Sequence, residues 1–185
     1  MARPLSDGTN RIPACLRRIL IFGLLLATHS FGADQRPGEY QVKAAFLLNF
    51  TKFVEWPAGD ASTPGAPISI CILGEDPFGH TLDQIVEGET VNGRRVTVQR
   101  LKEEQPKACE VLFVSSSEKN VKKVLDDLPT GVLTVGEGEG FLRAGGAIAF
   151  VLENRRVRFD INQNAARNAK LKISSKLLNV ARSVE

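Results

Sequence analysis

Two stretches decide the fold: residues 68–74 read ISICILG, and residues 110–116 read EVLFVSS. Each is a short, nearly continuous apolar run that lacks the regular apolar–polar alternation of a half-exposed strand. Strands covered by helices on both faces have this composition. Both runs therefore predict buried strands at the centre of an α/β domain.

The segments around these two strands alternate between helix and strand signals. Residues 78–87 have the apolar spacing of a helix, and residues 89–101 combine a turn with a strand. Ser117 is expected to cap a further amphipathic helix, and residues 131–136 predict the next strand. This alternation indicates an α/β fold with a mainly parallel central sheet and flanking helices.

Residues 146–161 (GAIAFVLENRRVRFDI) differ, because two strand-like runs flank a turn at Glu153-Asn154. The pattern predicts a C-terminal β-hairpin. Alternation along its second strand places Arg156 and Arg158 on one face. Two arginines spaced in this way can grip a carboxylate or a phosphate, and they can equally form a solvated face. Arg156 and Arg158 are therefore candidate anion-binding residues.

The first helix of the domain is expected before Pro57, and its sequence FLLNFTKFVEWP (46–57) is apolar on nearly every side. Such a helix either lies between two layers of one core or faces a second protein. We expect it to contribute to a contact with a partner, and the alternative is that its side chains are core. The candidate interface residues are Leu47, Leu48, Phe50, Phe53 and Trp56.

Residues 1–32 are identified as a signal peptide. A basic region precedes the apolar run ILIFGLLLA (19–27), and small residues follow it. An apolar run this short suits a signal peptide and is too short to span a membrane. Cleavage is expected within residues 30–33, with an uncleaved anchor as the alternative. The mature protein then holds one domain over residues 39–185.

The charge of the chain is unevenly distributed. Residues 1–32 carry a net charge of +3, which equals that of the whole chain, so the mature part is near neutral and does not indicate nucleic-acid binding. Residues 155–185 hold eight basic and two acidic residues, a net charge of +6, and residues 33–154 balance it with −6. This asymmetry indicates either ion pairs within one fold or a basic docking face.

The mature chain keeps two cysteines, Cys71 and Cys109. An even number in an exported chain suggests one disulfide, and two buried free thiols are the alternative. If the two residues pair, the closed loop stabilises the fold by roughly 4 kcal/mol on the chain-entropy relation.

Residues with catalytic chemistry are scarce. His80 is the only histidine left after processing, and it has no neighbour at the spacing of a metal ligand. The GEGEG stretch (136–140) lacks the spacing of a dinucleotide-binding turn, and its glutamates would repel a pyrophosphate. We therefore predict no catalytic residue, no metal and no cofactor.

Two long motifs show a family resemblance. EYQVKAAFLLNFTKFVEWP (39–57) resembles the opening of the YfiR family of periplasmic proteins. Residues 145–182, from GGAIAF to LLNVAR, are similar to the family's closing strand and helix motifs. The resemblance covers about residues 39–183, which is nearly the whole mature chain.

The resemblance implies a Rossmann-like α/β domain that commonly dimerises and is not an enzyme. It implies binding to the periplasmic sensor region of an inner-membrane diguanylate cyclase, whose repression lowers cyclic-di-GMP signalling and biofilm formation. An outer-membrane lipoprotein is a further partner in the family. The alternative function is a small-ligand module that binds an anion or nucleotide where the parallel strands end, with Arg156 or Arg158 as the anchor.

Cys71 and Cys109 match one disulfide of the family's namesake. A second cysteine pair of the namesake has no counterpart here, since Ala144, Ala147 and Ala149 are among the residues of that stretch. The resemblance thus implies a structural bridge and leaves a redox switch in doubt.

Overall fold

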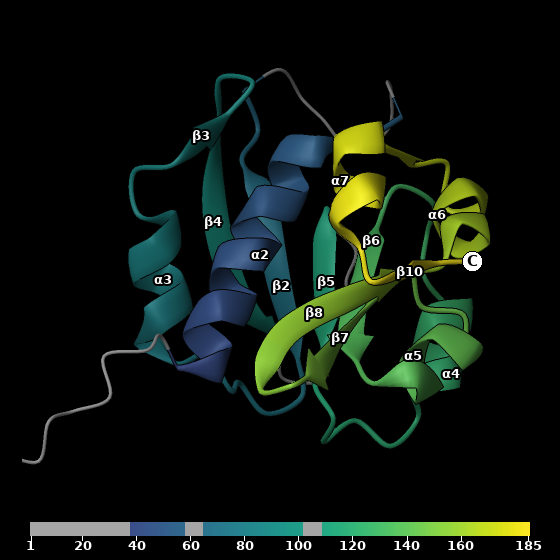
Figure 1. Ribbon diagram of the computed structural model, residues 1–185. Helices are drawn as coiled ribbons and strands as arrows, with labels where there is room; N and C mark the ends of the chain where they lie inside the picture. The colour runs from purple at the N-terminus through teal and green to yellow at the C-terminus, as the bar shows by residue number, and fades with distance from the viewer. Residues whose placement is uncertain (1–37, 58–64, 102–108) are drawn as a thin grey trace, which may run out of the picture. The chain divides into compact units, whose positions relative to one another are not determined.

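The computed structural model describes residues 38–57, 65–101 and 109–185 (Figure 1). The expected signal peptide (1–32) lies outside the described residues. Among the helices in the described ranges, none combines the length and the hydropathy that a membrane span needs. Everything below concerns the unit formed by residues 37–185.

Strands and helices alternate along most of this unit, as the sequence predicts. In chain order the elements are α2 (Glu39–Phe53), β1 (Val54–Glu55), β2 (Ile68–Leu73), α3 (His80–Val86), β3 (Thr90–Val91), β4 (Arg94–Leu101), β5 (Val111–Val114), α4 (Val121–Asp126), β6 (Leu133–Glu137), α5 (Glu139–Arg143), β7 (Ile148–Glu153), β8 (Arg156–Ile161), α6 (Gln163–Asn168), β9 (Lys172–Ile173), α7 (Ser175–Val180) and β10 (Ser183–Val184).

The central sheet has eight strands in the order β10-β8-β7-β6-β5-β2-β4-β3. The strands β4, β2, β5, β6 and β7 are parallel to their neighbours in this run. The pair β7–β8 is antiparallel and forms the predicted C-terminal hairpin, and β3 is an antiparallel edge strand. The mainly parallel, Rossmann-like α/β architecture is therefore confirmed.

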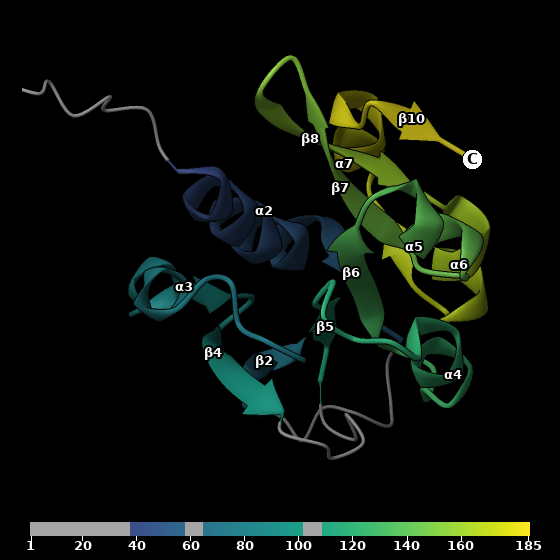
Figure 2. The same cartoon turned by 90° about the horizontal axis from the view of Figure 1, so that it is seen from below.

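Helices cover both faces of the sheet. Figure 2 shows α2 and α3 on one side of the sheet and α4 and α5 on the other. Alternate residues of β2 accordingly enter different clusters: Ile70 and Ile72 pack in the cluster with α2, and Cys71 and Leu73 pack in the opposite one. Burial on both faces explains why this strand is continuously apolar in sequence.

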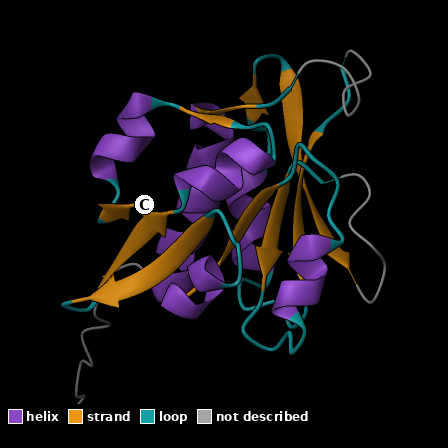
Figure 3. Ribbon diagram, turned by 90° about the vertical axis from the view of Figure 1, so that its right-hand side faces the viewer, coloured by secondary structure: helices purple, strands orange, loops and turns teal. Residues whose placement is uncertain are grey.

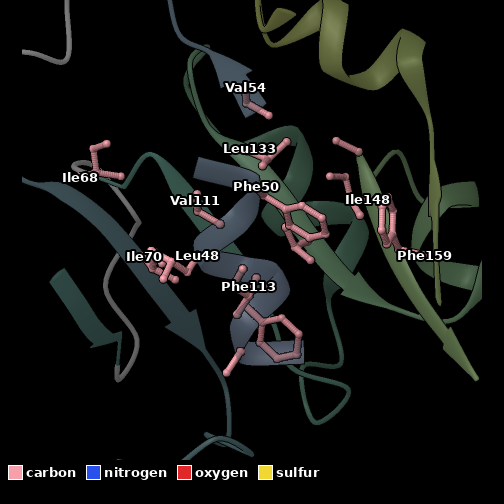
Figure 4. Packing of buried hydrophobic residues seen from close by; sticks show 14 of the residues in the cluster. Leu48, Phe50, Val54, Ile68, Ile70, Val111, Phe113, Leu133, Ile148 and Phe159 are labelled. Carbon is pink, nitrogen blue, oxygen red and sulfur yellow. The ribbon is translucent and has the colours of Figure 1, made fainter. Parts of the chain in front are cut away.

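Helix α2 lies within the core, against α3 and β8. Leu47 and Phe50 are fully buried, and Leu48 is 6% exposed. Phe50 packs edge-to-face on Phe159 of β8, at 5.2 Å between ring centroids (Figure 4). The core alternative is thus what the structure shows for these three residues, and the expectation that they contact a partner is corrected, because both sides of α2 are covered by the chain itself.

Two local details differ from the predictions. Ser117 does not cap a helix, since α4 begins at Val121 and Ser117 Oγ instead accepts the backbone N–H of Glu75 at 2.8 Å. Four two-residue strands, β1, β3, β9 and β10, were not predicted. Strands this short carry no period-2 pattern, so the sequence holds no signal for them.

Candidate functional site

The turn of the β7–β8 hairpin determines on which face of β8 the candidate anion-binding residues Arg156 and Arg158 lie. Asn154 and Arg155 have φ angles of +50° and +61°, as the two central residues of a type I′ turn require. Beyond the turn, Val157 and Phe159 pack with the α2 cluster. Arg156 and Arg158 therefore share the opposite face of β8, and both are exposed. Figure 3 shows the hairpin reaching beyond the helices that cover the sheet.

Most cations of the basic C-terminal region (155–185) form no ion pair with a described residue. Of the eight basic residues in residues 155–185, Arg182 is the one with an ion pair among the described residues. Arg156 and Arg158 have no carboxylate within ion-pair distance in those same ranges. Internal complementarity thus accounts for little of the charge asymmetry, and the docking-face alternative is favoured.

A pocket of about 420 Å³ lies at the carboxyl end of β6, where the sequence predicts a ligand crevice. It is lined by Glu39, Tyr40, Lys43, Glu137, Gly138, Glu139, Phe150, Val151, Leu152 and Arg182. Arg156 and Arg158 are not among these lining residues. The structure therefore does not bring the predicted arginines to the predicted crevice, and whether they bind an anion on the hairpin stays a prediction.

Lys43 forms the buried centre of this pocket. It is 4% exposed, ion-pairs with Glu39 and Glu137, and lies 4.4 Å from the centroid of the Tyr40 ring. Burial by itself lowers the pKa of Lys43, but hydrogen bonds to Glu137 and Glu39 outweigh burial and raise it. Burial, followed by the charge of Glu137, raises the pKa of Tyr40. The network fixes the start of α2 to the end of β6.

The second cation of the pocket is paired as well. Arg182 Nε donates to Asp160 Oδ1 at 2.8 Å, and its Nη2 lies 3.5 Å from Glu139 Oε1. The hydrogen bond to Asp160 raises the pKa of Arg182. Because three glutamates line the pocket beside two cations that are already paired, an anion would have to displace a carboxylate. The pocket does not favour an anionic ligand.

A second cavity of about 450 Å³ lies between α4, α5 and α6. Leu125, Leu128 and Val132 contribute apolar lining, and Lys122 and Arg143 contribute charge. Lys122 pairs with Asp126, one turn along α4. No polar side chain of this lining is both buried and unpartnered, since every buried side-chain N or O atom in the described ranges has a hydrogen-bond partner.

Cys71 and Cys109 form a disulfide, with their Cα atoms 5.8 Å apart. Cys71 lies in the middle of β2, and Cys109 lies two residues before the start of β5, which is paired with β2. The two side chains are 0% and 7% exposed and belong to the cluster under α4 and α5. The bridge joins two central strands inside the core, which suits a structural role.

Phe53 and Trp56 are the partly exposed members of the predicted interface set. Trp56 Nε1 donates to the carbonyl oxygen of Glu110 at 3.2 Å, and the carbonyl of Phe53 accepts the N–H of Ser174. Both residues thus hold the end of α2 to neighbouring segments. A contact of their exposed edges with a partner stays a prediction.

The remaining sequence candidates have structural roles. His80 is exposed at the first residue of α3. In the parts of the chain that the structure describes, no group of three potential ligands is placed to hold a metal. In the GEGEG stretch, Gly136 packs face-on against Phe141, and a Cβ there would lie 2.4 Å from that ring. Close packing, and not phosphate binding, explains this glycine.

Sequence reasoning missed the buried ionic residues. Glu110 is 5% exposed, accepts the N–H of Ser69 at 2.8 Å and pairs with Arg94. Lys43 gave one signal, a cation followed directly by the apolar residues of a helix. Glu110 gave a similar one, since it directly precedes a buried strand.

The chain was compared with curated protein sequences, solved structures and protein-family models. No curated protein sequence matches it. A solved structure that matches part of this chain is a conserved domain protein from Vibrio cholerae O1 biovar El Tor, at 11% identity and a TM-score of 0.46. That match covers 63% of this chain and 54% of the other, so this chain spans about half the length of that protein.

A protein-family model described as YfiR/HmsC-like matches residues 40–182. The match runs from the second residue of α2 to the residue before β10 and so includes the hairpin, the disulfide and all residues that line the Lys43 pocket except Glu39. The chain therefore belongs to the YfiR/HmsC-like family, a regulatory, non-enzymatic family of periplasmic proteins in cyclic-di-GMP signalling.

Proposed function

We propose that this protein is a periplasmic repressor that binds the periplasmic sensor region of an inner-membrane diguanylate cyclase. Bound protein lowers cyclic-di-GMP synthesis and, through it, biofilm formation. Repression requires that the protein bind the inactive state of the cyclase more tightly than the active state. An outer-membrane lipoprotein that competes for the repressor is part of the same proposal.

The observation that carries the proposal is the excess of basic residues in the C-terminal region, residues 155–185. Seven of its eight cations have no ion pair with the described residues, although the chain holds enough carboxylates to neutralise them. Of the three large apolar side chains that are exposed in the described ranges, Val180 and Val184 belong to the same region, and Leu152 lies on β7, across from Val157 of β8. Charge and apolar surface together support protein binding.

A small-ligand function has less support. The cations of the pocket at the end of β6 are paired with carboxylates of the chain itself. Buried cations that already have partners gain little from a second anion, and the network holds α2 in place. We therefore do not extend the proposal to an anion or a nucleotide.

We extend the proposal to a homodimer, as the family resemblance implies. Leu47, Leu48 and Phe50 are unavailable for it because they are buried. Phe53 and Trp56 remain as candidates. Sedimentation of the purified chain at several concentrations measures the dimer, and substitution of Trp56 by Ala tests the contact.

Deletion of the gene in its own host tests the proposed function. We expect cyclic-di-GMP and biofilm mass to rise, and we expect the tagged protein to recover a membrane protein with a diguanylate cyclase domain from solubilised envelopes. The control is a strain that also lacks this cyclase, in which deletion should change nothing. Unchanged cyclic-di-GMP after deletion, with no cyclase recovered, would reject the proposal.

A further inference from the structure

The outer edge of β8 is an open strand edge over half its length. Its partner β10 pairs only with Asp160 and Ile161. The N–H of Arg182 adds one bond, to the carbonyl of Phe159. In the described ranges, no strand lies beside Arg156–Arg158 on this edge.

The hairpin register shows which backbone groups face outward. A two-residue turn makes Glu153 and Arg156 a hydrogen-bonded pair, and such pairs alternate along an antiparallel ladder. Arg158 and Asp160 therefore also bond to β7, whereas Val157 points its N–H and C=O away from β7. The carbonyls of Phe159 and Ile161 do accept bonds from the C-terminal segment, as this alternation requires.

The two faces of this edge have different chemistry. On the α2 face, Val157 is half-buried and lies directly across from Leu152, which is 57% exposed. On the other face, Arg156 and Arg158 are exposed, and neither is within ion-pair distance of a described carboxylate. A strand added here would meet an apolar face at one residue and cations at the residues on either side.

We propose that the β8 edge, residues Arg156–Phe159, binds an extended segment of a partner protein in which acidic residues alternate with apolar ones. The segment adds a strand to the sheet through the N–H and C=O of Val157. Its apolar side chains contact Val157, and its carboxylates pair with Arg156 and Arg158. Main-chain bonds then supply affinity and the alternating side chains supply specificity.

Charge argues against a second copy of this chain as the occupant. In an antiparallel pair of two β8 edges centred on Val157, each Arg156 would lie across from the other copy's Arg158. Like charges directly opposite one another destabilise a strand pair. Exposed arginines also discourage edge-to-edge aggregation, so this edge accepts an acidic strand and repels its own copy.

Under the proposed function, the bound segment belongs to the periplasmic region of the diguanylate cyclase. The inference rests on the proposed function only for this identity of the partner. The binding chemistry can be tested without the cyclase. The probe is a short, labelled peptide with blocked ends in which Glu alternates with Val. Control peptides replace Glu by Lys or carry N-methyl groups on alternate amides.

Fluorescence anisotropy with the full chain is expected to show saturable binding of the Glu–Val peptide and none of the Lys peptide. The double variant Arg156→Glu/Arg158→Glu should weaken binding at least about tenfold, since two favourable cross-strand pairs become repulsive. Arg95→Glu, at an exposed arginine of β4, makes the same charge change elsewhere and should change affinity less than about twofold.

Val157→Pro removes the outward N–H and leaves the bonds between Arg156, Arg158 and β7 in place, as an edge strand tolerates. It should abolish peptide binding with the melting temperature nearly unchanged. Should this variant not fold, the N-methylated peptide decides the same question, because it cannot pair with the edge.

Binding of the N-methylated peptide at full affinity would reduce the contact to charge attraction and overturn the proposal, as would failure of the Glu–Val peptide to bind. A dimer of the chain that Val157→Pro dissociates would show that a second copy holds the edge, which also overturns it. Peptide binding with unchanged cyclic-di-GMP after gene deletion would reject the proposed function and leave the strand site standing.

Discussion

Helix α2 and the β7–β8 hairpin are opposite cases of surface and core. Helix α2 is apolar on nearly every side, yet its leucines are buried in the chain's own core. The hairpin carries Arg155, Arg156 and Arg158, and its tip lies in solvent. The apolar residues on several sides of α2 thus indicate that other parts of the same domain cover this helix. The surface suited to a partner is the hairpin, which combines exposed arginines with an open strand edge.

The largest effect is expected at α2. Leu47→Ser with Leu48→Ser should prevent folding, because each change removes a buried side chain and introduces a hydroxyl, at about 2–5 kcal/mol or more per site. Asn49→Ser, at the exposed position next to them, is the matched control and should leave the fold intact. Circular dichroism with urea titration measures both. If the double variant folds as a monomer, Leu47 and Leu48 are not core residues, and α2 again becomes a candidate partner surface.

The disulfide comes next. Cys71→Ala with Cys109→Ala should lower the free energy of unfolding by roughly 4 kcal/mol, which lowers the melting temperature by on the order of 10 °C for a domain of this size. The wild-type protein should show a similar decrease with reductant, and the double variant none. A wild-type melting curve that ignores reductant, with the bridge shown to be reduced, would contradict the structural role.

The Lys43 network should contribute less, because Glu137 and Glu39 are partly exposed. Lys43→Met leaves two carboxylates without their cation and should lower the free energy of unfolding by about 2–3 kcal/mol. Lys52→Met, at an exposed ion pair with Glu89, is the control and should change it by less than about 1 kcal/mol. Equal effects of the two substitutions would show that burial of Lys43 matters little.

The same network predicts a loss of stability in alkali. The pKa of Lys43 is raised by folding, so its contribution is complete below the ordinary pKa of 10.5 and disappears as the pH rises through the folded value. The pKa of Tyr40 is also raised by folding, so the unfolded state loses this proton first and gains stability above the ordinary value of 10.0. Urea midpoints above pH 10 should therefore fall more steeply for wild type than for Lys43→Met, and parallel curves would contradict this.

The smallest effect on stability is expected at the hairpin. Arg156→Glu with Arg158→Glu should change the free energy of unfolding by no more than about 0.5 kcal/mol, because neither arginine is paired with a described residue. The expected change in the free energy of unfolding is thus much smaller here than for the Leu47 and Leu48 substitutions in α2. A large loss of stability in the arginine variant would mean that the hairpin arginines are structural.

Patterns that follow from burial were predictable from sequence. ISICILG and EVLFVSS became β2 and β5 because a strand covered on both faces must be apolar throughout. The period-2 alternation of residues predicted the hairpin. It also predicted that Arg156 and Val157 lie on opposite faces of β8. The disulfide followed from the resemblance and an even cysteine count, and the structure confirms it.

Features that depend on distant neighbours could not be predicted. The sequence left open whether Leu47 and Leu48 belong to the core or to an interface, because α3 and β8, which cover the sides of α2, are distant in the sequence. The pairing of Lys43 with Glu137 joins residues 94 positions apart. Strand β10 exists only because the C-terminal segment lies beside β8.

The most direct test of the central claim is amide hydrogen exchange of the protein alone and in complex with the sensor region of the recovered cyclase. We predict that exchange slows on binding in residues 151–159, which hold the open edge of β8, and stays unchanged in residues 46–57. Slowed exchange confined to residues 46–57, with the hairpin unaffected, would contradict the account and place the partner at the end of α2.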